Sequence, residues 1–266
     1  MGKKSVFLAV CAIAKNEGVY FGEWIEYHRT LGVGKFYIYD NGSSDGTRAV
    51  LEPHISAGLV EYRPFPGAKA QLKAYKDCVR RHRRDAKYIA FLDLDEFIVP
   101  VKHKTIPDYL RSLGNVSAVE INWVVYGSGG AAKREPGLVI ERFRDHSLPS
   151  DPVNRPVKTI ADPRRILTFF STHTPVLWFG KRVNAAGDRI RKMWSRRPPA
   201  GQDIIRINHY MVKSEEEFYE KQLRGDALFG DARHRKSDYF RQNDKNDVRG
   251  DAIMDERVRE LKKAVK

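Results

Sequence analysis

The stretch Tyr88-Ile-Ala-Phe-Leu-Asp-Leu-Asp-Glu-Phe-Ile-Val-Pro100 decides the fold, because an apolar run is interrupted there by three carboxylates. The run predicts a buried strand, and Asp93, Asp95 and Glu96 follow where the chain should leave the sheet. Side chains alternate along a strand, so Asp93 and Asp95 should point to the same side. Neighbouring carboxylates repel each other unless a cation lies between them, and oxygen ligands suit Mg²⁺ or Mn²⁺. We therefore expect a metal site that leaves coordination positions for substrate phosphates.

The first 100 residues predict alternating strands and helices. Strands are expected at Val6–Ala14, Lys35–Asp40, Leu59–Tyr62 and Tyr88–Leu92, and helices at Tyr20–Leu31, from Asp45 to about Ile55, and at Ala68–Arg84. This order predicts an α/β fold with a mostly parallel, Rossmann-like sheet flanked by helices. In such a sheet ligands bind at the carboxyl ends of the strands, which is where Asp93 and Asp95 should lie.

The rest of the chain is predicted to be less regular. Strands are expected at Ala118–Val125 and Ile204–Tyr210, and helices at Thr105–Leu113, Ser214–Leu223 and, in a polar and looser tail, about Ile253–Lys263. Residues 133–200 are rich in Arg and Pro and predict irregular structure with short strand-like pieces. No repeat or low-complexity linker divides the chain, so residues 1–266 are expected to form a single domain.

The composition indicates a basic protein of the cytoplasm. The net charge is +14, which favours polyanionic partners such as nucleic acid, an anionic membrane or phosphorylated substrates. Cys11 and Cys78 lack metal-ligand spacing and are expected to be reduced core residues. The apolar run after Lys4 is only about ten residues long, which favours a buried first strand over a signal peptide. No stretch reaches the roughly 18 apolar residues that a membrane span needs.

Two further polar loops should lie beside the carboxylates. Asp40-Asn-Gly-Ser-Ser-Asp-Gly-Thr47 follows the second strand, and Lys15-Asn16-Glu17 follows the first. An ordinary capped turn would explain either loop alone. Three polar loops at one edge of a parallel sheet favour a nucleotide site instead, with backbone N–H groups near helix starts.

The order of several motifs resembles a known family. Ala12-Ile-Ala-Lys-Asn-Glu17, Tyr39–Thr47, Trp24-Ile-Glu-Tyr-His28 and Phe91–Phe97 look like the nucleotide-binding half of GT-A glycosyltransferases. With Trp123, Tyr126-Gly-Ser-Gly129, Ile207–Phe218, Lys221 and Gly225, the chain more closely resembles the bacterial branch of glycosyltransferase family 92, also called the domain of unknown function 23 group. That branch is itself similar to family 2. The resemblance covers roughly residues 5–230.

The resemblance implies a UDP-sugar donor, Mn²⁺ or Mg²⁺ on its diphosphate, and a glycan or glycolipid acceptor. It divides the chain into a nucleotide-binding half (5–100), an acceptor and catalytic half (101–230) and a helical tail (231–266). The residues expected to bind the nucleotide-sugar are Ala14, Asn16, Glu17, Asp40, Gln71, Asp93 and Leu94. Those expected to hold the metal are Asp93, Asp95 and His209, with His173 as the second choice for the histidine.

An inverting reaction, which is also taken from the resemblance, needs a base for the acceptor hydroxyl. Glu216 is the first choice, because Glu217 stands at capping-box spacing from Ser214. Glu217 and Asp151 are alternatives. Further candidates are cations for the phosphates (Lys158, Lys181 and Arg182) and aromatic side chains for sugar stacking (Trp123, Tyr126 and Trp178).

The leading hypothesis is therefore a metal-dependent, inverting hexosyltransferase of polysaccharide biosynthesis. Its basic surface also predicts peripheral contact with the anionic inner membrane face. A nucleotidyltransferase would carry a glycine-rich basic loop where Lys15-Asn16-Glu17 stands. A basic nucleic-acid-binding protein would leave Asp93, Asp95 and Glu96 unexplained, so no nucleic-acid partner is expected.

Overall fold

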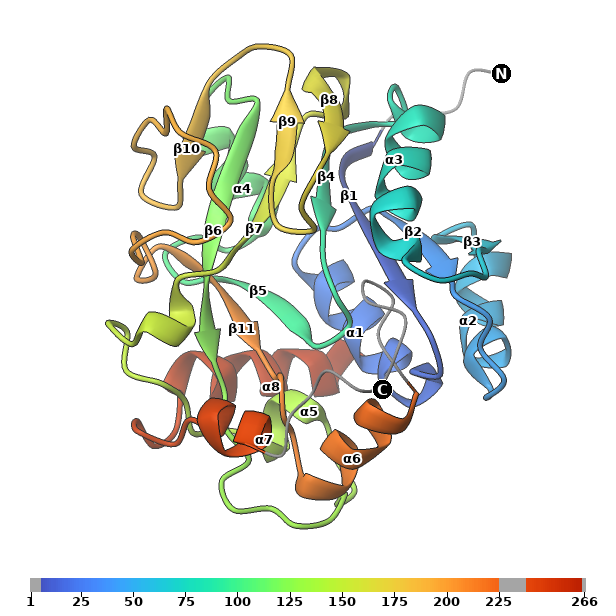
Figure 1. Cartoon of the computed structure of the whole chain (residues 1–266), viewed down its shortest axis with the longest axis vertical. Helices are drawn as coiled ribbons and strands as arrows, with labels where there is room; N and C mark the ends of the chain where they lie inside the picture. Colours follow the sequence, from blue (N-terminus) through green and yellow to red (C-terminus); the bar gives the residue numbers. More distant parts are fainter. Residues whose placement is uncertain (1–5, 225–237, 265–266) are drawn as a thin grey trace.

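A nine-stranded sheet organises the computed structural model, which describes residues 6–224 and 238–264 (Figure 1). Its strand order is β3-β2-β1-β4-β7-β6-β11-β5, and β10 also pairs with β6. Five strand pairs are parallel, and three are antiparallel: β4–β7, β6–β7 and β11–β5. The predicted α/β fold with a mostly parallel sheet flanked by helices is confirmed.

The parallel part of the sheet comes from the first hundred residues. It contains β1 (Val6–Ala14), β2 (Lys35–Asp40), β3 (Val60–Pro64) and β4 (Ala86–Phe91), linked by α1 (Gly18–Thr30), α2 (Thr47–Ser56) and α3 (Ala70–His82). Alternate residues of β1 face opposite sides, because the side-chain period of a strand is two. Val10 belongs to the core on the α1 side, whereas Cys11 belongs to the core that packs under α3. Apolar side chains on both faces of the strand are therefore buried.

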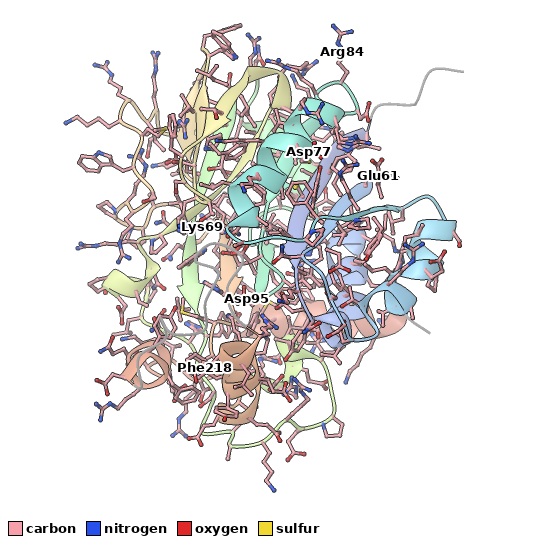
Figure 2. The ribbon with its side chains drawn as sticks, turned by 45° about the vertical axis from the view of Figure 1, so that its right-hand side comes forward. Glu61, Lys69, Asp77, Arg84, Asp95 and Phe218 are labelled. Carbon is pink, nitrogen blue, oxygen red and sulfur yellow. The ribbon has the colours of Figure 1, made fainter. Side chains whose placement is uncertain are left out.

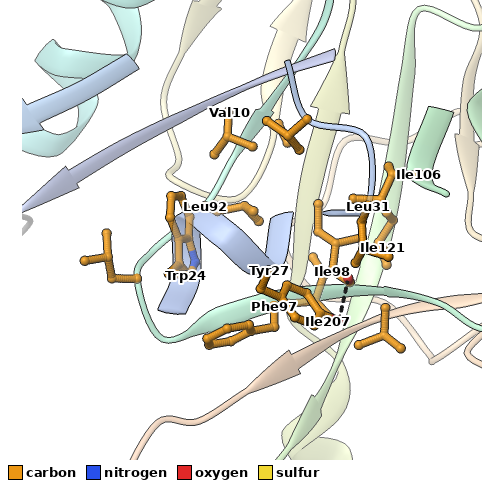
Figure 3. Packing of buried hydrophobic residues seen from close by; sticks show 14 of the residues in the cluster. Val10, Trp24, Tyr27, Leu31, Leu92, Phe97, Ile98, Ile106, Ile121 and Ile207 are labelled. Carbon is orange, nitrogen blue, oxygen red and sulfur yellow. Dashed lines mark hydrogen bonds between the residues drawn. The ribbon is translucent and has the colours of Figure 1, made fainter. Parts of the chain in front are cut away.

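The stretch 88–100 forms two strands rather than one interrupted strand. β4 ends at Phe91, and β5 (Glu96–Pro100) runs antiparallel to β11 (Ile205–His209) at the far end of the sheet. Helix α1 fixes this crossing, because Tyr27 Oη donates to the carbonyl of Ile98 (3.1 Å; Figure 3) and Trp24 Nε1 donates to that of Glu96 (2.9 Å). Asp93-Leu94-Asp95 consequently lies in a tight turn between two strands.

The region expected to be irregular contains several short elements. Helix α4 (Ile106–Ser112) is capped by Thr105, as predicted, and leads to β6 (Ala118–Val125). Then follow α5 (Val139–Arg142), β7 (Val157–Ala161), the hairpin of β8 (Ile166–Phe169) and β9 (Pro175–Leu177), and β10 (Arg182–Asn184), with single 3₁₀ turns at Pro152–Asn154 and Pro163–Arg165. One edge of β6 pairs with β7, and the other is shared between β10 and β11.

The described part of the C-terminal tail belongs to the core. After α6 (Glu215–Leu223) and α7 (Asp238–Asn243), helix α8 (Ala252–Ala264) packs against α1 and α5. Met254, Val258 and Leu261 are buried at helical spacing in the main core cluster. The expectation of a looser tail is therefore wrong for this helix, while Gly225 and residues 226–237 lie outside the described part. No helix within 6–224 and 238–264 is both long and apolar enough to cross a membrane.

Replacing Leu261 by Ala should lower the free energy of unfolding by about 2–4 kcal/mol, because a large buried side chain leaves a cavity. Urea unfolding followed by circular dichroism measures the change. The matched control is Lys263→Ala on the exposed face of the same helix, expected within about 0.5 kcal/mol of the parent. Equal effects of the two changes would show that α8 contributes no core.

Candidate active site

A pocket lies where the parallel strands end. β1 and β2 end level, since Ala14 pairs with Asp40, and β4 ends beside them. The cavity measures about 230 Å³. Seven of the nine residues expected to bind nucleotide-sugar or metal line it: Ala14, Glu17, Gln71, Asp93, Leu94, Asp95 and His209. Figure 2 shows Asp95 at the centre of the molecule, between Lys69 before α3 and Phe218 of α6.

The loops after β1 and β2 are joined into one rim. Asn16, at φ 52°, donates its N–H to Ser43 Oγ (2.9 Å) and accepts from the N–H of Ser44 (2.8 Å). Asp45 accepts from the N–H groups of Gly18 (2.9 Å) and Thr47 (3.0 Å), which begin α1 and α2. Asp45 therefore ties two helix starts together rather than capping α2 alone. Asn16 itself lines a neighbouring cavity and not this pocket.

Asp40 has a structural role that its sequence position does not reveal. Its Oδ1 accepts from the N–H of Ser43 (2.8 Å), and its Oδ2 accepts from Tyr62 Oη. The side chain is buried and does not line the pocket. Both carboxylate oxygens close the β2 loop here, and the contact with a base or ribose stays a prediction.

Asp93 is held from two directions at the floor of the pocket. Gln71 Nε2, from α3, donates to Asp93 Oδ1 (2.7 Å), and Lys158 Nζ, from β7, donates to Oδ2 (2.8 Å). Lys158 also lies 3.2 Å from Glu96, whose Oε2 accepts from the N–H of Asp93 (2.9 Å). The first carboxylate of the Asp93-Leu94-Asp95 turn therefore shares one buried ammonium group with Glu96.

This cluster is nearly neutral despite its three ionisable groups. Burial opposes the charged form of Lys158, but Asp93 and Glu96 raise its pKa well above the ordinary value. Burial raises the pKa of Glu96 to about 8, against the attraction of Lys158. At neutral pH Lys158 is paired with the nearer carboxylate, Asp93, and Glu96 holds a proton. Buried charge is tolerated when it is paired in this way.

Asp95 is the second charged centre of the pocket. Lys221 of α6 donates to its Oδ2, and His209 Nε2 of β11 lies 3.4 Å from its Oδ1. Burial works against the Asp95 carboxylate, but Lys221 and then His209 hold its pKa well below the usual range. Burial lowers the pKa of His209, so its imidazole is neutral at neutral pH. A neutral imidazole beside a carboxylate can bind a metal ion.

Two polar atoms at the pocket are buried without a hydrogen-bond partner in the described part of the chain. They are Nδ1 of His209 and Nε1 of Trp123, whose rings lie 4.2 Å apart. Unpaired buried polar groups are costly and call for a partner such as a ligand or water. His173 also lines the pocket, but its Nδ1 donates to the carbonyl of Val157 (2.9 Å), and burial lowers its pKa to about 4.

The carboxylate and imidazole groups of Asp93, Asp95 and His209 are suitable ligands for a divalent cation, but they are not arranged as a formed metal site. Within the described residues, no group of three or more His, Cys, Asp or Glu side chains is arranged to hold a metal ion. Asp95 and His209 face each other, and Asp93 also lines the pocket. An ion would compete with Lys221 for Asp95 and with Lys158 for Asp93.

The predicted catalytic carboxylates do not line this pocket. Glu217 is a buried structural residue: its carboxylate accepts two hydrogen bonds from Arg142 (2.9 and 2.8 Å), and the predicted capping box with Ser214 is present. Burial works to raise its pKa, but Arg142 and Ser214 lower it to about 2, so Glu217 would be a weak base near neutral pH. Glu216 is exposed and accepts from the N–H of Arg134 (2.8 Å).

Other predicted residues lie away from the pocket. Asp151 begins a 3₁₀ turn and pairs with Lys245 (2.9 Å), and Arg182 pairs with buried Glu120 (2.5 Å). The Tyr126 hydroxyl is buried and donates to Asp251. Exposed Lys181 and Trp178 follow the β8–β9 hairpin.

The pocket also contains residues that the sequence analysis did not assign to the site. Lys15 and Arg224 add positive charge, and Arg224 donates to Glu17 (2.5 Å). Thr172 lies beside His173 in the turn of the β8–β9 hairpin, and Met211 follows β11. Lys15 stands directly after a predicted strand, and that position could have indicated that it lines the pocket. Arg224 and Thr172 carry no such local signal.

Comparison with known proteins adds independent information. The model of Glycosyltransferase family 92 matches residues 5–243. A family 92 protein of rice, Oryza sativa subsp. japonica, is 33% identical over 112 residues, which are 41% of this chain and 19% of the rice protein. A beta-1,4-galactosyltransferase of Caenorhabditis elegans is 27% identical over 77% of this chain and 48% of its own length. A galactan beta-1,4-galactosyltransferase of Arabidopsis thaliana is 29% identical, with coverages of 64% and 36%.

The chain spans about half or less of the length of these relatives. They come from plants and a nematode, so membership of a bacterial branch stays a prediction. Among solved structures, TarS of S. aureus has a TM-score of 0.40 at 12% identity, covering 59% of this chain and 47% of that one. Glucosyl-3-phosphoglycerate synthase from Mycobacterium tuberculosis scores 0.35 at 16% identity, with coverages of 60% and 58%. Similarity at this level supports no functional conclusion.

Replacing Glu96 by Gln should flatten the dependence of stability on pH. The folded protein keeps the Glu96 proton up to about pH 8, whereas the unfolded chain releases it near 4.5. Stability is therefore lost as pH rises through this window, and the neutral amide removes the loss. The difference in Tm between about pH 6 and about pH 9 measures this loss of stability. Exposed Glu256→Gln is the control, and an equal fall of Tm in Glu96→Gln and the parent would contradict the assignment.

Proposed function

Because the chain belongs to glycosyltransferase family 92, we propose that it transfers a hexose from a UDP-linked donor to a hydroxyl group of a glycan or glycolipid. One observation carries the proposal. The strand-end pocket brings His209 together with Asp93 and Asp95, which lie more than a hundred residues earlier in the sequence. Carboxylate and imidazole donors beside basic side chains suit a diphosphate with its divalent cation.

The positive side chains of the pocket would bind the diphosphate. Lys15, Lys221 and Arg224 line the cavity, and Lys158 lies beneath Asp93. A sugar-nucleotide bond breaks with negative charge developing on the leaving diphosphate, so fixed positive charge favours the transition state. A Mn²⁺ or Mg²⁺ ion held by Asp93, Asp95 and His209 would act there as a Lewis acid.

Trp123 is the proposed contact for the transferred sugar or the acceptor. Its Nε1–H is buried without a partner in the described chain, and its ring lines the pocket beside His209. An indole can donate one hydrogen bond to a sugar hydroxyl and present an apolar face to the sugar ring. The names of the nematode and Arabidopsis relatives make UDP-galactose the first donor to test.

Asp95→Asn should lower the rate at which UDP is released from a UDP-sugar at least about 100-fold, because the metal loses a charged ligand. The assay supplies Mn²⁺ and a panel of UDP-sugars and measures released UDP, with and without EDTA. The matched control is Asp203→Asn, an exposed residue paired with Lys102, which should retain activity within about twofold.

Binding can be measured separately from turnover. UDP with Mn²⁺ should raise the Tm of the parent protein, since a ligand of the folded state stabilises it, and Asp95→Asn should lose that rise. Full activity of Asp95→Asn would refute the metal assignment. Absence of UDP release with every donor, together with no Tm rise, would refute the proposed function.

Glu216 is the remaining candidate for the base of an inverting reaction. Each carboxylate that lines the pocket has a cationic partner: Glu17 with Arg224, Asp93 with Lys158, and Asp95 with Lys221. Glu216 lies on the first turn of α6, the helix that also supplies Lys221. Within the described chain its carboxylate accepts only the backbone hydrogen bond from Arg134.

Glu216→Gln should lower kcat at least about 100-fold with little change in KM or stability, as expected for loss of general-base catalysis. Glu217→Gln is the contrasting variant. It should lower the free energy of unfolding by roughly 3 kcal/mol, because Arg142 is left without its carboxylate. Unchanged kcat in Glu216→Gln would exclude it as the base, whatever the outcome for Glu217→Gln.

A further inference from the structure

Exposed apolar side chains are concentrated on one part of the surface. Of the eleven large hydrophobic residues that are exposed in the described chain, six lie between residues 167 and 194: Leu167, Phe170, Trp178, Phe179, Met193 and Trp194. Phe170 is 75% exposed, Phe179 64% and Trp178 62%. Single exposed apolar residues are common, but a group of large ones marks an interaction site.

Two segments carry this group, and the fold brings them together. The first is the β8–β9 hairpin with the residues just after it, and the second is the loop after β10. The N–H of Val157 donates to the carbonyl of Ser195 (3.2 Å), while the carbonyl of Val157 accepts from His173 in the hairpin turn (2.9 Å). Arg182 of β10 donates to the carbonyl of Pro175 of β9 (2.6 Å). Figure 1 shows β8, β9 and β10 at the end of the molecule opposite α6 and α7.

The same surface is strongly basic. Residues 163–202 contain nine Lys or Arg and a single acidic residue, Asp188. Arg182 and Arg197 form ion pairs with buried Glu120, and Arg164 forms one with Asp162. The exposed cations of this stretch are Lys181, Arg189, Arg191, Lys192 and Arg196. Cations also lie over the exposed rings, with Arg165 4.2 Å from the centre of the Phe179 ring and Lys192 5.6 Å from that of Trp194.

We propose that this apolar–basic face, formed by residues 166–181 and 187–197, docks on an anionic phospholipid membrane. Exposed Trp and Phe side chains partition into the headgroup layer of a bilayer. Lys and Arg side chains can extend past them to lipid phosphates, and each adds to binding when the lipids are anionic. The charge and the apolar groups together fit this partner better than either would alone.

Nucleic acid fits the surface less well. Proteins that stack single-stranded bases place their aromatic residues in a basic groove that follows the backbone. Here Phe170 in the hairpin turn and Phe179 just after the hairpin are exposed, and Leu167 and Met193 add aliphatic area that base stacking does not use. Binding of oligonucleotides is therefore the competing outcome of the test.

The docking face adjoins the candidate active site. Thr172 and His173, in the turn of the hairpin, line the pocket, and Phe170 stands at the start of the same turn. A membrane under the hairpin would bring the pocket close to lipid headgroups. The link to a lipid-borne acceptor rests on the proposed function, whereas membrane docking rests on the surface alone.

Vesicle flotation of the full chain tests the docking. Vesicles of phosphatidylcholine alone are compared with vesicles that also contain phosphatidylglycerol, at low and high salt. The parent should float only with the anionic vesicles and should be released by salt. The triple variants Phe170→Ser/Trp178→Ser/Phe179→Ser and Arg189→Gln/Arg191→Gln/Lys192→Gln should each bind on the order of tenfold or more weakly.

Matched variants control for charge and apolar area. Lys104→Gln/Lys133→Gln/Arg249→Gln removes three exposed cations elsewhere, and Val19→Ser/Tyr219→Ser/Leu223→Ser removes three exposed apolar side chains elsewhere. Both should float like the parent. Tryptophan emission should shift to shorter wavelength with anionic vesicles, and Trp178→Phe/Trp194→Phe should lose the shift.

The proposal is overturned if the parent does not float, if the controls lose as much binding as the two test variants, or if single-stranded oligonucleotides bind through this face and vesicles do not compete. UDP release without vesicles is measured in parallel, so failure of membrane docking is distinguishable from failure of the proposed function.

Discussion

The pocket depends on one buried cation, Lys158, that reaches from β7 to the turn between β4 and β5. It pairs with Asp93 and approaches Glu96 at the place where the chain leaves the parallel strands and crosses to the far end of the sheet. Without a cation at this position, Asp93 would lose its charged partner and buried Glu96 would lose the positive charge beside it. The charge that shapes the turn is thus the same charge that lies beneath the proposed diphosphate.

Strand register places the other half of the pocket. β11 lies between β6 and β5, with His209 opposite Val125 on one side and Glu96 on the other. Because side chains alternate along a strand, His209 faces Asp95 while Asn208 points to the opposite face, where it donates to Tyr126 Oη (2.9 Å). A shift of one residue would exchange the two side chains. The apolar pairing of β5, β6 and β11 therefore fixes which group meets Asp95.

Local sequence patterns predicted those features of the structure that depend on interactions between residues close in sequence. The strands and helices of the first hundred residues are present, and the ends of β1, β2 and β4 meet as their parallel order requires. Ion pairs between segments that are far apart in the sequence could not be predicted in this way. Arg142 lies 75 residues from Glu217, and Lys221 lies 126 residues from Asp95. Asp40 is a further example. Its position at the end of β2 favoured contact with a ligand, but the sequence did not indicate that Ser43 and Tyr62 donate hydrogen bonds to its two carboxylate oxygens.

The two sides of the pocket are built by different means. On one side, parallel strands end together and offer short loops whose backbone is fixed by hydrogen bonds such as those of Asn16 and Asp45. On the other side, the β8–β9 hairpin contributes Thr172 and His173 from its turn while its outer side chains stay exposed. The hairpin contacts β7 through hydrogen bonds of His173 with Val157 and Thr159, but its two strands form a sheet of their own. Its exposed side chains therefore take no part in the pairing that aligns the parallel strand ends. The pocket is thus formed by a side fixed through strand pairing and a side fixed through hydrogen bonds of one hairpin turn.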